Sequence, residues 1–184
     1  DTNDKLNCWH SAFAVVRIQD NFFEWAQICD CLILVIYQNG DFKLLVNDYD
    51  HDAEALRFLQ QSVQRGEKDP RAMLEQGPFL QIWQDANKTY GVLDGDEKFI
   101  SFLNFGSEAL DNVSHILIFS DGLFIPAADP NQPDDFQTLV KLFLEGGLNN
   151  VKEFVRGLEN SDPECKKYLR FKQHDDITAI AISF

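Results

Sequence analysis

The chain has 184 residues, of which 45% are hydrophobic, and a formal net charge of −14. This length and composition suit one domain with a sizeable core, so a single domain over residues 1–184 is predicted. The strong negative charge argues against binding to nucleic acid or to an anionic membrane by long-range attraction. The longest apolar run, Cys31 to Tyr37, is far below the ~20 residues that a transmembrane helix needs.

The first 46 residues predict an antiparallel meander. Runs rich in β-branched and aromatic residues indicate strands over 11–18, 22–29, 32–38 and 42–46. Asn39-Gly40 is a strong signal for a two-residue hairpin turn between the last two of these strands.

The four cysteines are Cys8, Cys29, Cys31 and Cys165. The Cys29-Asp30-Cys31 spacing is not that of a structural zinc site, and the sequence has no second pair of this kind. We therefore expect buried free thiols, which favours a cytoplasmic protein.

The middle of the chain alternates helices with turns. Apolar residues at helical spacing predict a helix from Ala53 to about Gln64, capped by Asp50 or Asp52. A short helix over 70–76 is expected to end at Gly77-Pro78. Two short strands, over 89–93 and 99–105, are expected around an acidic turn that lacks the alternating ligands of an EF-hand loop.

The last third predicts helices and one further strand. A Pro- and Asp-rich loop over 126–135 precedes two apolar helical stripes, over 136–144 and 148–158, separated by Gly146-Gly147. The chain ends in an apolar, β-branched run. Helices together with an antiparallel meander predict an α+β fold.

Two acidic motifs lie at strand ends. The apolar run up to Phe119 is followed at once by Ser120-Asp121-Gly122, and the C-terminal run is preceded by His174-Asp175-Asp176-Ile177-Thr178. If these two strands pair antiparallel, Asp121 and Asp175 converge at one rim of a sheet. Carboxylates that converge without Lys or Arg nearby favour a divalent cation. The simpler interpretation of Ser120-Asp121-Gly122 is an Asp-Gly turn that ends a strand.

These motifs resemble the C-terminal half of the metal-dependent serine/threonine protein phosphatases of type 2C, the PPM family, in its short bacterial form. The segment from Trp25 to Tyr37, followed by Gly40, Leu44 and Asn47-Asp48, is similar to the strand hairpin and loop of that family. The resemblance implies an α-β-β-α sandwich, in which two stacked antiparallel sheets carry helices on their outer faces. It also implies hydrolysis of phosphoserine and phosphothreonine on protein substrates by a water activated by two metal ions.

The same resemblance assigns roles to individual residues. Asp121 and Asp175 would each hold Mn²⁺ or Mg²⁺, and Asp48 would contribute to a third, weaker ion. Asp176 would fix the turn that directs Asp175. His174 is a weak candidate for a general acid, and a polar loop residue explains it equally well.

The sequence departs from the family pattern near its start. The family's first metal motif, an Asp-Gly pair, does not precede Ser11, and Cys29-Asp30-Cys31 stands where the family usually has Gly-Asp-Ser. We therefore expect either a phosphatase domain without its N-terminal strands or a degenerate relative. We expect the strand Ala12–Ile18 to lie at an incomplete sheet edge; pairing of that strand on both sides within this chain would instead favour the degenerate relative. The chain alone should have little or no activity.

Three functions stay open at this point. The first is an active phosphatase. The second is a catalytically inactive phosphatase-like module that binds a protein partner. The third is an unrelated acidic α+β module that binds proteins.

Overall fold

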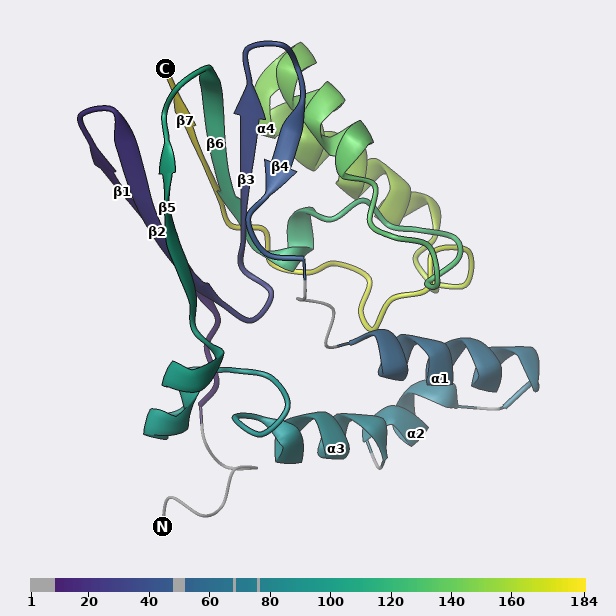
Figure 1. Cartoon of the computed structure of the whole chain (residues 1–184). Helices are drawn as coiled ribbons and strands as arrows, with labels where there is room; N and C mark the ends of the chain where they lie inside the picture. Colours follow the sequence, from purple (N-terminus) through teal and green to yellow (C-terminus); the bar gives the residue numbers. More distant parts are fainter. Residues whose placement is uncertain (1–8, 48–51, 68, 76) are drawn as a thin grey trace. The chain divides into compact units, whose positions relative to one another are not determined.

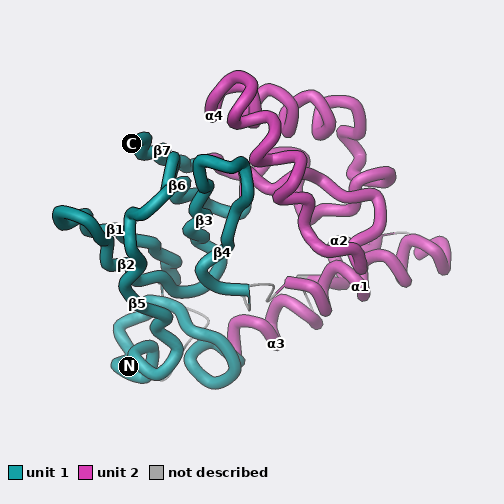
Figure 2. The backbone as a smooth tube through the Cα atoms, turned by 45° about the horizontal axis from the view of Figure 1, so that its top comes forward, with its two compact units in different colours: residues 1–49, 85–121, 178–184 teal, residues 50–84, 122–177 magenta. Residues whose placement is uncertain are grey.

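The computed structural model of the chain describes residues 9–47, 52–67, 69–75 and 77–184. Strands and helices both occur, and the fold is α+β as predicted (Figure 1). The chain divides into two compact units (Figure 2). Unit 1 comprises residues 1–49, 85–121 and 178–184 and contains the strands, whereas unit 2 comprises residues 50–84 and 122–177 and contains the α-helices.

Unit 1 contains a three-stranded antiparallel sheet in the order β1-β2-β5. Its strands are β1 (Phe13–Gln19), β2 (Phe22–Ile28) and β5 (Asn104–Ala109). A tight turn at Asp20 and Asn21 joins β1 to β2 and sets the register in which Val16 faces Trp25. The meander predicted for the first 46 residues is confirmed for this hairpin but does not continue, because the next strand of the chain belongs to the other sheet.

The second sheet of unit 1 has four antiparallel strands in the order β4-β3-β6-β7. They are β3 (Leu32–Tyr37), β4 (Phe42–Leu44), β6 (Val113–Phe119) and β7 (Ala179–Ser183). Only Tyr37 of β3 is not fully buried, as expected for an apolar strand that is covered on both faces. The turn between β3 and β4 uses Gly40 at a φ of 86°, which confirms the predicted hairpin.

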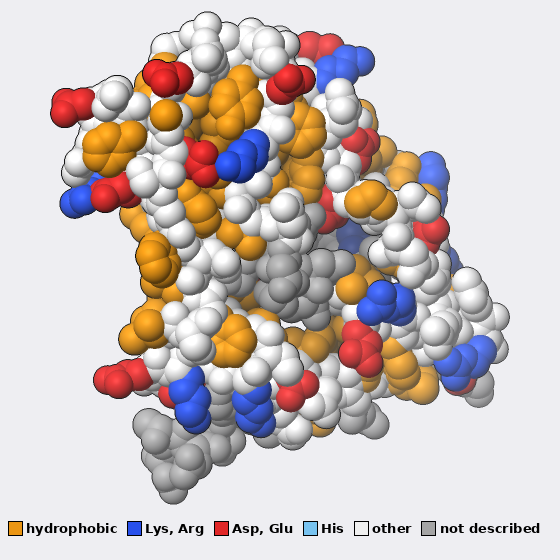
Figure 3. Space-filling view, in the orientation of Figure 1, with side chains coloured by type: hydrophobic (Ala, Val, Ile, Leu, Met, Phe, Trp, Pro, Cys, Tyr) orange, Lys and Arg blue, Asp and Glu red, His pale blue; other side chains and the backbone are white. Residues whose placement is uncertain are grey.

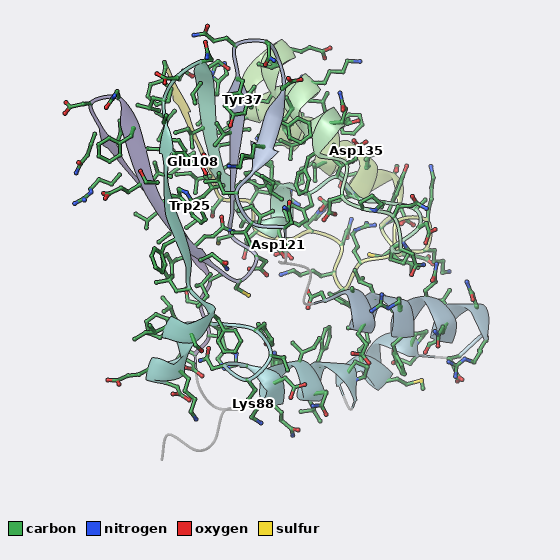
Figure 4. All side chains as sticks on the ribbon, viewed as in Figure 1. Trp25, Tyr37, Lys88, Glu108, Asp121 and Asp135 are labelled. Carbon is green, nitrogen blue, oxygen red and sulfur yellow. The ribbon has the colours of Figure 1, made fainter. Side chains whose placement is uncertain are left out.

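A shared core shows that the two sheets are stacked. Its buried residues come from both sheets: Phe23 from β2, Ile33 and Val35 from β3, and Val113 and Ile116 from β6. Trp25 and Tyr37, labelled in Figure 4, pack against this cluster from opposite sheets. On the surface, Lys43 of β4 pairs with Glu108 of β5 at 2.8 Å. The space-filling view shows hydrophobic side chains gathered among charged ones over these strands (Figure 3).

The two strand predictions for the middle of the chain are wrong, wholly or in large part. Of the strand predicted over 99–105, only residues 104 and 105 belong to a strand, at the start of β5, because Glu97–Phe102 is a 3₁₀-helix, η2. The start of η2 is capped by the Asp96 side chain, which accepts from the Lys98 N–H. Residues 89–93 form only isolated bridges, one of which pairs Ser11 with Leu93. The short helix predicted over 70–76 is confirmed, since α2 (Pro70–Glu75) ends before Gly77. Pro78 then begins a further helix that was not predicted, α3 (Pro78–Asp85), because proline fits the first helical turn.

The helices of unit 2 agree better with their sequence patterns. They are α1 (Ala53–Gln64), α2 (Pro70–Glu75) and α4 (Phe136–Ser161), in addition to α3. Ala55, Leu59 and Leu74 form a small core that Phe79 and Phe171 cover. Asp52 is the N-cap residue of α1 but makes no capping hydrogen bond through its side chain, and Asp50 lies outside the described residues.

Helix α4 confirms the predicted interruption. Its backbone leaves helical geometry at Gly146 and Gly147 and then resumes, so the two apolar stripes belong to two helical segments. The Asp135 side chain caps its start by accepting from the Thr138 N–H at 2.9 Å. Within the described part of the chain, no helix is long and apolar enough to cross a membrane.

Candidate functional site

The candidate site begins at one rim of the four-stranded sheet in unit 1. The last residue of β6, Phe119, lies opposite Ala179, the first residue of β7, and opposite Leu32, the first residue of β3. This register confirms the predicted antiparallel pairing of the two strands that carry the acidic motifs. The rim therefore brings together residues that follow β6 and residues that precede β3 and β7.

Pairing continues one step beyond the strands. The Ser120 N–H donates to the Thr178 carbonyl at 3.0 Å, and the Thr178 N–H donates to the Ser120 hydroxyl at 3.1 Å. Asp121 comes next and is half-buried as the first residue of the short 3₁₀-helix η3 (Asp121–Leu123). Figure 4 labels Asp121 at this end of the four-stranded sheet. The two hydrogen bonds between Ser120 and Thr178 thus fix the backbone directly before Asp121, the predicted metal ligand.

Cys31 and Asp30 lie at the same rim as Asp121. Cys31 precedes β3, and burial, followed by the charges of Asp30 and Asp121, raises its pKa to about 11. Burial and the neighbouring carboxylates thus favour the neutral form of the thiol, which is the less nucleophilic form. Cys29 sits in the turn at a φ of 62°, so Cys29 and Cys31 do not share one strand face. Cys165 is buried as expected, whereas Cys29 and Cys31 are only half-buried, and Cys8 lies outside the described residues.

The surroundings of residue 122 explain why a glycine follows Asp121. It belongs to unit 2, where a Cβ at this position would stand 2.8 Å from the Asp176 carbonyl carbon and 3.4 Å from the Asp175 Cβ. A side chain would overlap the main chain of the second acidic motif. The sequence showed the glycine, but this close approach depends on a segment more than fifty residues away and could not be inferred from it.

Asp175 in unit 2 is held by basic residues. Its Oδ1 accepts from the Lys172 Nζ at 2.7 Å and from the Asp176 N–H at 2.7 Å, and its carbonyl oxygen accepts from the Arg156 Nη2 at 2.5 Å. The premise that this acid has no Lys or Arg nearby is therefore wrong. Arg156 could not be foreseen because it comes from helix α4, nineteen residues away. Lys172 stands only three residues before Asp175 and was readable from the sequence as a nearby positive charge.

His174 contacts a buried acid. Its Nδ1 lies 2.9 Å from the Glu159 Oε2, and the same carboxylate oxygen pairs with the Arg156 Nη1 at 2.6 Å. Glu159 is only 4% exposed. The imidazole is thus engaged with helix α4, a contact that suits a loop-anchoring role.

The described residues do not by themselves complete a metal site. Among them, no group of three or more His, Cys, Asp or Glu side chains is arranged to hold a metal ion. Asp121 belongs to unit 1, Asp175 belongs to unit 2, and Asp48 lies outside the described residues. Their carboxylate oxygens are the donors that Mg²⁺ and Mn²⁺ prefer. The convergence of these three acids stays a prediction.

Comparisons with known proteins point to one fold. No protein-family profile and no curated protein sequence matches the chain. Among solved structures, a bacterial serine phosphatase is 14% identical with a TM-score of 0.50, over 95% of this chain and 57% of that one. A variant of a bacterial serine phosphatase is 12% identical with a TM-score of 0.50, over 94% of this chain and 53% of that one.

A third similar structure is the catalytic domain of the serine/threonine phosphatase PstP in complex with two manganese ions. It is 16% identical with a TM-score of 0.48, over 94% of this chain and 57% of that one. The chain thus spans little more than half the length of each of these structures. At such identities the likeness concerns the fold: this chain has the two-sheet α+β fold of serine phosphatases.

Proposed function

We propose that the chain is the core of a metal-dependent phosphatase that acts on phosphoserine and phosphothreonine in proteins. One observation carries the proposal: the two acidic motifs are fastened together on each side of Asp121. Ser120 pairs with Thr178 in unit 1, and Gly122 lies against Asp176 in unit 2. This arrangement favours the prediction that both acidic motifs supply metal ligands.

The proposed ligands are oxygen donors. Asp121 and Asp175 would hold two Mn²⁺ or Mg²⁺ ions, and Asp48 would add a third, weaker ion. When bound, such ions lower the pKa of a coordinated water toward ~7 and clamp the phosphoryl oxygens. The contribution of this chain would be to direct the carboxylates, through Ser120 at Asp121 and through Arg156 at Asp175.

A specific observation favours an alternative, a catalytically inactive phosphatase-like module that binds a protein partner. The Lys172 ammonium already neutralises the Asp175 Oδ1 at 2.7 Å. A divalent cation at this oxygen would have to displace that ammonium. The inactive module requires no cation, because in it the ion pair between Lys172 and Asp175 would stay in place.

Mn²⁺ titration by isothermal calorimetry tests both functions. We expect the wild type to bind Mn²⁺ and Asp121→Ala and Asp175→Ala to bind it at least tenfold more weakly, because each loses a ligand. Lys98→Gln, an exposed change in η2, serves as the control. Hydrolysis of p-nitrophenyl phosphate and of a phosphoserine peptide is measured in parallel.

The outcomes separate the functions. Mn²⁺ binding with turnover would support the phosphatase. Binding that the two substitutions weaken, with little or no turnover, is what we expect for this chain alone and would support the proposed metal site. The inactive module is favoured if the wild type binds no Mn²⁺, because that module needs no cation. Absence of Mn²⁺ binding, or binding that survives Asp121→Ala unchanged, would contradict the proposed function.

A further inference from the structure

Two arginines in unit 2 donate hydrogen bonds to the main chain of the loop that carries Asp175. The Arg156 Nη2 donates to the Asp175 carbonyl at 2.5 Å, and the Arg170 Nε donates to the Gln173 carbonyl at 3.0 Å. The two acceptor carbonyls are two residues apart in a segment without regular secondary structure. Because a guanidinium is planar with fixed donor directions, each contact constrains orientation as well as distance.

Each arginine is itself oriented by a nearly buried acid. Glu159 accepts from the Arg156 Nη1 at 2.6 Å, and Asp162 accepts from the Arg170 Nη1 at 3.1 Å. Asp162 is only 8% exposed. The Arg170 Nη2 also donates to the Glu159 carbonyl at 3.0 Å, which ties the loop to the end of α4.

Both arginines thus bridge a nearly buried acid and the main chain of the loop. Buried ion pairs carry a desolvation cost that often cancels their attraction, so they are poor devices for stability alone. They do hold attached groups in one geometry. Here the attached group is the backbone that directs the Asp175 side chain.

We propose that Arg156, supported by Glu159, is a positioning residue that fixes Asp175 for binding a divalent cation. This inference rests on the proposed function, in which Asp175 is a ligand. Arg170, supported by Asp162, holds the preceding turn of the loop. None of these four residues is itself a ligand: Arg156 acts through the Asp175 main chain, and Lys172 is the one that contacts the Asp175 carboxylate.

Charge and positioning predict opposite effects, which makes the proposal testable. Arg156 and Lys172 each place one positive charge beside Asp175. If only charge mattered, removal of either would strengthen Mn²⁺ binding, because like charges repel. If Arg156 positions Asp175, its removal weakens binding despite the lost repulsion.

The experiment compares Arg156→Gln, Arg156→Lys and Lys172→Gln by Mn²⁺ calorimetry on the full chain. Lys141→Gln is the matched control, since Lys141 is an exposed residue of the same helix whose only ion pair given by the structure, with Glu145, is 4.0 Å long. Loss of an outer-shell partner of a metal ligand typically weakens affinity 10- to 100-fold. We expect about a tenfold loss for Arg156→Gln, a smaller loss for Arg156→Lys, and equal or tighter binding for Lys172→Gln. Equal or tighter binding by Arg156→Gln would overturn the proposal.

Hydrogen exchange on the metal-free protein supplies a second readout. The Asp176 N–H donates to the Asp175 Oδ1, so its exchange rate reports where that side chain points. Arg156→Gln should speed exchange over residues 173–176 and leave the strands unchanged. If the wild type binds no Mn²⁺, the proposed function fails, and unchanged exchange in Arg156→Gln would then show separately that Arg156 does not position Asp175.

Discussion

At the scale of single residues, Asp162 makes a pH-dependent contribution to stability. It follows α4 and accepts hydrogen bonds from the N–H groups of residues 166, 167 and 168 and from Arg170. Burial alone would raise the pKa of Asp162, but these donors outweigh burial and lower the pKa to about 2. In the unfolded chain the pKa of an aspartate is about 3.9.

Asp162→Asn should therefore destabilise the protein in a pH-dependent way. A carboxyl whose pKa is lower in the folded state stabilises the fold above its unfolded pKa and loses that effect as the pH falls through its folded value. At pH 7 we expect a loss of about 3 kcal/mol, because the variant leaves the Arg170 charge unpaired. The difference between the two proteins in urea unfolding should shrink between about pH 4 and pH 2. A difference that is constant over this range would show that the charge of Asp162 contributes nothing.

At the scale of elements, the break in α4 depends on one glycine. Gly147 has a φ of 72° and a ψ of −171°, a region that is essentially restricted to glycine. The Asn150 amide donates to the Leu142 carbonyl at 2.8 Å, which satisfies a group near the interruption. The break is therefore built into the sequence.

Gly147→Ala should destabilise the protein by about 1–3 kcal/mol, because alanine is strained in that conformation. Gly157→Ala is the matched control in the same helix, where no neighbouring atom would meet the new Cβ. It should stabilise by up to about 1 kcal/mol, since alanine is the better helix former. Urea unfolding measures both changes. Equal effects of the two substitutions would contradict a specific role for Gly147.

Elements could be predicted from the sequence where the interactions that form them lie within a few residues of one another. Strands β1, β2 and β3 and helix α1 carry their periodicity within a few residues, and so they were predicted to within a residue or two. Residues 99–102 were misassigned as strand because their apolar residues fit either state, whereas the 3₁₀-helix that contains them starts at a local cap from Asp96. In the site, Asp121 and Asp175 were readable as acids at strand ends. The contact between Arg156 and Asp175 spans nineteen residues and leaves no local signal.

At the scale of the whole molecule, β1 forms an edge of its sheet. Within the described residues β1 pairs with β2 on one side, and the only further pairing near its start is the bridge between Ser11 and Leu93. This agrees with the expectation of an edge strand at Ala12–Ile18, whereas the expected missing partner strands stay a prediction. Val15 and Ile18 on this strand are 51% and 42% exposed. Such an apolar edge favours pairing with another chain.

The net charge of −14 opposes that pairing between copies of this chain. The balance should depend on salt, because the Debye length falls from ~10 Å at 0.1 M to ~3 Å at 1 M and screens the repulsion, whereas apolar contact is not screened. We therefore expect concentration-dependent self-association in sedimentation velocity that increases with salt. Val15→Lys should reduce it, since a charged residue on an edge strand opposes strand addition. Val63→Lys, at an exposed position on α1, is the matched control and should have no such effect. Association that falls as salt rises would mean that ion pairs, and not the β1 edge, join the molecules.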